Sequence, residues 1–168
     1  RTADTDQSYG ERTDFQLLRH FGSDPSNQVS NHPDFTTGKL WTLQDGLYYT
    51  ALWAEGGSAN GTTQLAPQAK VEHWAVRRWV STVNRAVTIS GHAAKILDWG
   101  GVDSGQAHIV VDGATIFSAR THGRDTNYSV KVTVHIGSLV DFLITAGPTE
   151  TGGAFGPVKF TATIRAAP

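Results

Sequence analysis

The sequence contains neither cysteine nor methionine among its 168 residues. Without cysteine there is no disulfide framework, no thiolate metal site and no cysteine nucleophile. No apolar run approaches the roughly 20 residues that a membrane-spanning helix needs, so we expect no membrane association. A chain without an initiator methionine is expected to begin inside a longer precursor. Separately, we expect the domain to be part of a multidomain parent protein.

Charge is also scarce in this chain. Charged residues make up 17% and the formal net charge is −1, so we expect no attraction to nucleic acid or to an anionic membrane. The 18 glycines and the short Val, Ile and Thr runs are typical of an all-β extracellular domain, secreted or at the cell surface. The length suits one domain over residues 1–168, with residues 1–14 as a flexible arm.

The clearest pattern lies between Gln106 and Thr145. Asp112-Gly113 separates two apolar runs, and an Asp-Gly pair favours the type I′ turn of a β-hairpin. Residues 128–136 alternate between apolar and polar, which predicts a strand with one buried face. Further strands are expected at 40–43, 47–53, 71–83, 85–97, 139–145 and 159–165, and loops at 22–38 and 55–70. Residues 14–21 are expected to form a short helix, a strand, or an irregular segment that packs Phe15 and Leu17.

Strand signals at this spacing predict an all-β fold, an antiparallel two-sheet β-sandwich with few helical residues. Alternation along each strand then selects the side chains that should point between the sheets. The predicted core consists of Trp79, Val87, Ile89, Val110, Ile116, Val130, Val132, Val134, Phe142, Ile144, Phe160 and Ile164.

Several segments between residues 75 and 164 resemble a domain of bacterial extracellular proteins, many of which degrade polysaccharides. These are AVRRWVSTVNRAVTISG, GGVDSGQAHIVVDGATIFSA, VTVHIGSLVDFLIT and FTATI. The resemblance implies a jelly-roll β-sandwich similar to the galactose-binding-like carbohydrate-binding modules of families 6 and 35. The chain departs from that pattern at Ser104-Gly105, where Gly-Val is usual, and at Ser138, where Asp is usual. Such motifs of Gly, Asp and β-branched residues specify turns and strands more than they specify a function.

Trp99 is the first candidate for ligand contact. It lies between Asp98 and Gly100-Gly101, with no alternation to carry it inward, and an exposed indole is costly unless it binds something. Sugar C–H faces stack on flat aromatic rings, whereas Trp79 and Trp41 lie inside strand patterns and are expected in the core. If Trp99 is instead a core residue, the ligand site is expected on the sheet face near Trp53 and Tyr49.

The loops before and after the 106–119 hairpin leave from the same end, because a hairpin returns the chain to its starting point. Their polar side chains are therefore expected to converge on one ligand, although glycine-rich loops also tolerate polar residues for no functional reason. The candidate ligand-binding residues of these loops are Trp99, Asp98, Asp103, Arg124, Asp125, Asn127 and Tyr128.

Two further groups of residues have alternative interpretations. Of Arg77 and Arg78, one is a candidate to grip ligand hydroxyls or a carboxylate; alternatively, one is solvated and the other stacks on an indole or bridges to Asp141. Calcium, which prefers six to eight hard oxygens, is the candidate cofactor. Its possible ligands are Asp98, Asp103 and Asp112, with Asp4 and Asp6 as another donor pair. The seven histidines lack zinc-site spacing.

Catalysis is not expected. A glycosidase needs two carboxylates about 5–10 Å apart, but the four glutamates fall in loops or at loop borders, and no Gly-x-Ser-x-Gly motif occurs. We therefore expect a non-catalytic carbohydrate-binding module of a secreted bacterial protein that acts on polysaccharide, with polysaccharide or oligosaccharide as its partner. A structural or adhesion domain and a small glycan-active enzyme remain alternatives.

Overall fold

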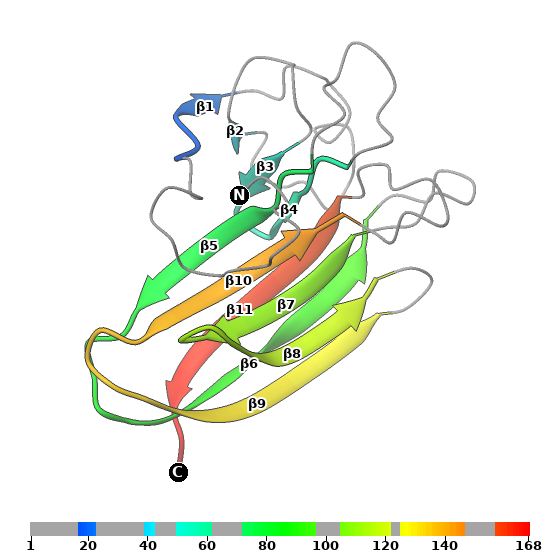
Figure 1. The fold of residues 1–168 in the computed structure, drawn as a ribbon. Coiled ribbons are helices and arrows are strands. Elements are labelled where there is room, and N and C mark those ends of the chain that lie inside the picture. The colour runs from blue at the N-terminus through cyan, green and yellow to red at the C-terminus, as the bar shows by residue number, and fades with distance from the viewer. Residues whose placement is uncertain are drawn as a thin grey trace.

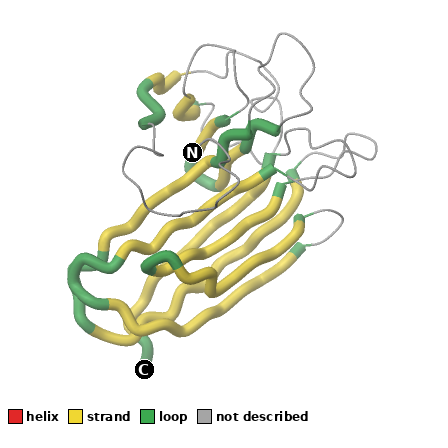
Figure 2. The backbone as a smooth tube through the Cα atoms, in the orientation of Figure 1, coloured by secondary structure: helices red, strands yellow, loops and turns green. Residues whose placement is uncertain are grey.

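The computed structural model describes residues 17–22, 39–42, 50–61, 72–96, 105–121, 125–146 and 157–168. Figures 1 and 2 show that the described chain is built from strands, and none of these segments is a helix that could cross a membrane. The strands are β1 (His20–Gly22), β2 (Leu40–Thr42), β3 (Ala51–Trp53), β4 (Gly56–Ser58), β5 (Ala75–Val80), β6 (Arg85–Lys95), β7 (Gln106–Val111), β8 (Ala114–Arg120), β9 (Thr126–Val134), β10 (Leu139–Thr145) and β11 (Val158–Ala166).

Two antiparallel sheets stack to form a β-sandwich. One sheet has the order β1-β2-β3-β4-β11-β6-β9, and the other has the order β5-β10-β7-β8. In Figure 1 the four-stranded sheet lies in front of β11, β6 and β9, while β1 to β4 extend beyond it at one end. The prediction of an all-β, two-sheet antiparallel sandwich is confirmed.

The hairpin between β7 and β8 has the predicted turn. Asp112 and Gly113 both have positive φ values, 47° and 86°, as a type I′ turn requires. The Leu139 amide donates a hydrogen bond of 2.7 Å to Oδ1 of Asp112, which ties the hairpin tip to the start of β10. Asp112 is therefore explained by the turn rather than by a metal site.

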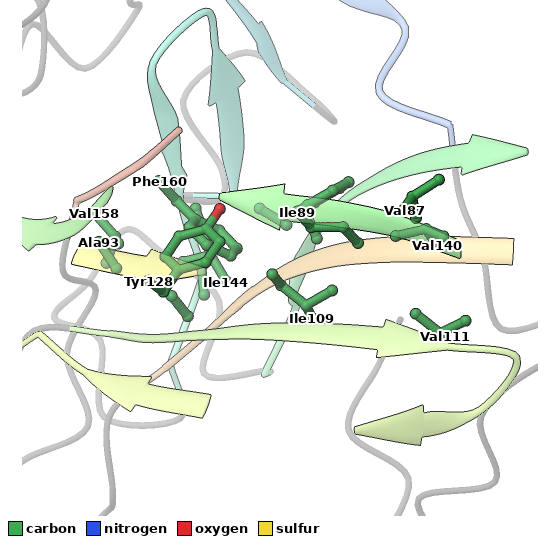
Figure 3. Close-up of a cluster of buried hydrophobic side chains, with 14 of the residues drawn as sticks. Val87, Ile89, Ala93, Ile109, Val111, Tyr128, Val140, Ile144, Val158 and Phe160 are labelled. Carbon is green, nitrogen blue, oxygen red and sulfur yellow. The ribbon is translucent and has the colours of Figure 1, made fainter. Parts of the chain in front are cut away.

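The hydrophobic core lies between the two sheets and consists of alternate residues from the strands of both. Val87 and Ile89 from β6 meet Ile109 and Val111 from β7 and Val140 from β10 in Figure 3. All but one of the predicted core residues belong to this core or pack against it. Val110 is the exception: it is buried, but it pairs with Asp141 on the outward face of the four-stranded sheet.

One prediction about the loops is wrong. Residues 55–70 were expected to be loop, but Gly56–Ser58 forms β4 between β3 and β11. Glycine weakens a strand in general, so its presence argued against one here. At these positions the neighbouring strands come too close for a side chain, since a Cβ on Gly56 would lie 2.0 Å from the Val158 carbonyl oxygen.

The segment at 14–21 was open between helix and strand. Its described part, residues 17–21, leads into β1, which pairs with β2. The strand alternative is therefore confirmed for His20 and Phe21 only. Residues 17–19 are irregular, with Leu17 77% exposed rather than packed, and residues 14–16 lie outside the described residues.

Candidate functional site

Most of the predicted loop site cannot be placed. Trp99, Asp98, Asp103 and Arg124 lie outside the described residues, so the convergence of the two loops on one ligand stays a prediction. Tyr49, a candidate for the alternative sheet-face site, also lies outside them.

Tyr128 is a core residue and not a ligand-facing one. It lies on β9 with only 7% of its surface exposed, and its ring centroid is 4.5 Å from that of Phe117. Its hydroxyl donates a hydrogen bond of 2.6 Å to the Thr161 carbonyl on β11. Gly91 on the intervening strand β6 makes this reach possible, since a Cβ there would lie 2.7 Å from the Tyr128 hydroxyl.

The two remaining loop candidates are at the surface. Asp125 and Asn127 are both exposed at the start of β9. Oδ1 of Asn127 lies 2.9 Å from Nδ1 of His92 on the neighbouring strand β6. Asn127 is thus engaged with another side chain of the sheet, and both residues remain open to solvent.

Two tryptophans exchange the positions that the sequence predicted for them. Trp53, a candidate for the sheet-face site, is only 2% exposed and clusters with Leu40, Ala51 and Ile96. Trp41, which was expected in the core, is 45% exposed. The prediction that Trp41 is buried is wrong, and the burial of Trp53 leaves no indole surface open to a ligand there.

Trp41 forms an exposed aromatic pair with Phe21. Phe21 on β1 pairs directly with Trp41 on β2, and their ring centroids are 4.8 Å apart with 35° between the ring planes. Phe21 is 51% exposed. We call Phe21 and Trp41 the aromatic platform, because the two rings present a shared apolar surface to solvent.

The sheet topology explains why these rings are open. Trp41 pairs with Phe21 on one side and with Leu52 of β3 on the other. Leu52 packs against the main core, so the side chains of all three residues lie on the inner face of the seven-stranded sheet. Residues directly opposite in paired strands lie on the same side. The four-stranded sheet ends at β5, which approaches β3, so β1 and β2 lie beyond its edge (Figure 1). Arg19 and Lys39, two residues before each ring, are exposed.

Arg77 and Arg78 both have structural partners. Nε and Nη2 of Arg78 donate to the two carboxylate oxygens of Asp141 at 2.7 and 2.8 Å. This confirms the expected bridge to Asp141. Nη2 of Arg77 donates to the Trp53 carbonyl at 2.6 Å, which ties β5 to the end of β3. Burial lowers the pKa of the Arg77 guanidinium, an effect that the Glu55 carboxylate opposes.

In the part of the chain that the structure describes, no group of three or more His, Cys, Asp or Glu side chains is placed to hold a metal ion. The calcium ligands expected from the sequence lie mainly at Asp98 and Asp103, outside these residues. Calcium binding therefore stays an expectation.

Comparisons with known proteins do not assign the chain to a family. No family model matches the chain, and no curated protein matches it. Among solved structures, pika GITRL aligns with a TM-score of 0.36 at 10% identity, over 62% of this chain and 94% of that one. A family 35 carbohydrate-binding module from an environmental isolate aligns with a TM-score of 0.36 at 14% identity, over 82% of this chain and 83% of that one.

Proposed function

We propose that this domain binds carbohydrate without catalysis and that the aromatic platform is its stacking surface. The observation that carries the proposal is the exposed pair Phe21 and Trp41, whose rings are 51% and 45% open to solvent. Apolar rings that face water on a domain with an ample core are typical of binding surfaces.

The geometry of the pair suits a sugar. The rings contact one another at 4.8 Å, so each supports the orientation of the other before a ligand arrives. A pyranose offers a face of C–H groups that packs on an aromatic ring, and little side-chain entropy is lost when the ring is already held in place. The exposed cations Arg19 and Lys39 can donate hydrogen bonds to sugar hydroxyls at the rim.

The placement of the carboxylates supports a non-catalytic role. Asp141 is bound by Arg78, Oδ1 of Asp112 accepts a bond from the Leu139 amide, and Glu72 accepts a bond from Trp74. Each of these carboxylates has a structural task, whereas glycoside hydrolysis needs two carboxylates that face one bond. In this proposal the parent protein is a secreted or cell-surface bacterial protein that acts on polysaccharide.

Affinity electrophoresis on a panel of neutral polysaccharides tests the proposal. The native domain should be retarded by at least one of them without releasing reducing sugar. Trp41→Ala should weaken that binding at least about tenfold, which corresponds to about 1.4 kcal/mol, and Trp41→Phe should restore part of it. Ile136→Ala is the matched control, because Ile136 is also an exposed apolar side chain, at 68%, and lies in the β9–β10 turn.

Three outcomes would change the proposal. Binding that survives Trp41→Ala but is lost in Trp99→Ala places the site in the predicted loops instead. No binding to any glycan, together with burial of the platform by a neighbouring domain of the parent, favours a structural or adhesion domain. An affinity and a melting temperature that are unaffected by EDTA would contradict the expectation that the domain binds calcium.

A further inference from the structure

A second surface lies on the outward face of β11, β6 and β9, away from the aromatic platform. The register brings three residues into line at three successive levels of these strands. Every one of the nine side chains can form hydrogen bonds. From one end to the other the levels are Arg165–Thr88–Lys131, Thr163–Ser90–Ser129 and Thr161–His92–Asn127. We call these nine residues the polar face.

The polar face is open to solvent. On the outer strands, Arg165, Thr163, Lys131, Ser129 and Asn127 are exposed, and the remaining four residues are half-buried. Neighbouring strands lie about 4.8 Å apart and alternate residues about 6.7 Å apart. The nine positions therefore cover about 10 Å by 13 Å, which is the size of a small oligosaccharide rather than of a single ion.

The level that contains Thr88 carries two positively charged side chains, Lys131 and Arg165. Thr88 pairs with Lys131 on one side and Arg165 on the other, so the two cations start about 10 Å apart. Nζ of Lys131 donates to the main-chain oxygen of Pro168, the last residue of the sequence, at 3.3 Å. The ammonium of Lys131 therefore lies beside the segment that follows β11, the strand that carries Arg165.

None of the nine side chains is a carboxylate. On β9 the nearest described carboxylate is Asp125, six residues or about 20 Å from Lys131. Two exposed cations with no carboxylate side chain among the nine positions attract an anion, even on a chain whose formal net charge is −1.

We propose that the polar face binds a sulfated polysaccharide, with a sulfate ester held by Lys131, Thr88 and Arg165. A sulfate ester has three free oxygen atoms arranged as a tripod. An ammonium, a hydroxyl and a guanidinium on three adjacent strands supply one donor group to each oxygen. The hydroxyls of Thr163, Ser90 and Ser129 at the next level, about 6.7 Å away, are then available to the hydroxyls of the same sugar. This proposal concerns a different surface from the aromatic platform and does not depend on it.

Other polyanions fit this face less well. Each phosphate of duplex DNA is a diester with only two free oxygen atoms, so it leaves one of the three donors unmatched. A carboxylate is planar and has only two oxygen atoms, so it leaves one of the three donors unmatched.

The test uses three polymers that share one backbone: dextran sulfate, carboxymethyl-dextran and unmodified dextran. The native domain should bind dextran sulfate most tightly, and the affinity should fall as sodium chloride increases, because exposed charges are screened. The double variant Lys131→Gln/Arg165→Gln should weaken that binding at least about fivefold, in line with the modest energies of exposed charge pairs. Thr88→Val should weaken it by a smaller factor without moving the melting temperature by more than about 2 °C.

Arg85→Gln is the matched control. Arg85 is an exposed cation on the same strand β6, but it pairs with the buried Val134 and so lies on the opposite side of the sheet. It should retain native affinity, and so should Trp41→Ala. The proposal fails if Arg85→Gln loses as much affinity as the double variant, or if the double variant binds dextran sulfate as the native domain does. It also fails if carboxymethyl-dextran or added duplex DNA binds as tightly as dextran sulfate.

Discussion

The region built from β5 to β11 and the region built from β1 to β4 differ in how they bury their apolar side chains. Strands of six to eleven residues form the first region. Its main hydrophobic cluster consists of side chains from both sheets. The second region has strands of only three residues, and its own cluster contains Leu40, Ala51, Trp53 and Ile96. We call these regions the sandwich and the extension.

This difference determines where aromatic side chains are exposed on the molecule. In the sandwich each sheet covers the inner face of the other, so aromatic rings such as Phe160 and Tyr128 become core. In the extension the opposing sheet has ended, and the inner face carries Phe21 and Trp41 into solvent. Stability and ligand contact are therefore expected to separate between the two regions.

The largest effect is expected from Phe160→Ala in the sandwich. Phe160 is 5% exposed and lies against Tyr128 and Phe142, with centroid distances of 5.8 and 6.0 Å. Truncation of a buried phenyl ring leaves a cavity between the sheets and should cost about 4 kcal/mol of unfolding free energy. Urea denaturation followed by far-UV circular dichroism measures this loss. A cost under about 1 kcal/mol would mean that the sandwich is not the stable region.

Asp141→Ala should produce the next largest effect. The Asp141 carboxylate is 1% exposed on the outward face of β10 and has a two-point contact with Arg78, whose side chain is 32% exposed. Loss of the carboxylate leaves the partly desolvated guanidinium of Arg78 without its partner. We expect this to lower the free energy of unfolding by about 3 kcal/mol, because Arg78 can still reach water. The double variant Arg78→Met/Asp141→Ala should recover part of this loss in the same urea titration. If it is less stable than Asp141→Ala, the cost does not come from the stranded charge.

Sequence patterns predicted the sandwich well, and the reason is local. Alternation over a long strand such as 126–134 fixes which side chains face inward, whatever lies on the other side. The Asp112-Gly113 turn follows from backbone chemistry in the same way. The bridge from Arg78 to Asp141 was among the alternatives because a nearly buried carboxylate needs a cation.

The candidate site was much harder to predict, because it depends on tertiary arrangement. Trp41 and Trp53 both lie in short apolar runs, and nothing local distinguishes an indole under a second sheet from one beyond its edge. β4 was missed because the glycines that lower strand propensity are required by the close approach of β11 at Gly56. Only the structure shows that Trp41 alternates with two residues, Leu40 and Thr42, that are buried on the other face.

Tyr128→Phe should cost about 1 kcal/mol near neutral pH, because it removes one buried hydrogen bond to the Thr161 carbonyl. It should also change the pH profile. Burial raises the pKa of the Tyr128 hydroxyl, so the folded state keeps a proton that the unfolded state loses above about pH 10. This contribution is fully present below the unfolded pKa and disappears as the pH rises. The native protein should therefore lose stability between pH 10 and 11 more steeply than the variant in urea titrations; equal slopes would contradict the buried hydroxyl.

Trp41→Ala should have the smallest effect on folding. The indole is 45% exposed, and its main aromatic contact is with Phe21 on the adjoining short strand β1. Local rearrangement of β1 and β2 can absorb that loss without opening the sandwich, so we expect a change in melting temperature of less than about 2 °C. Differential scanning fluorimetry beside Phe160→Ala gives the comparison directly. A fall in melting temperature of more than about 5 °C would show that the aromatic platform stabilises the fold itself. Ligand binding would then not be needed to explain why the two rings are present.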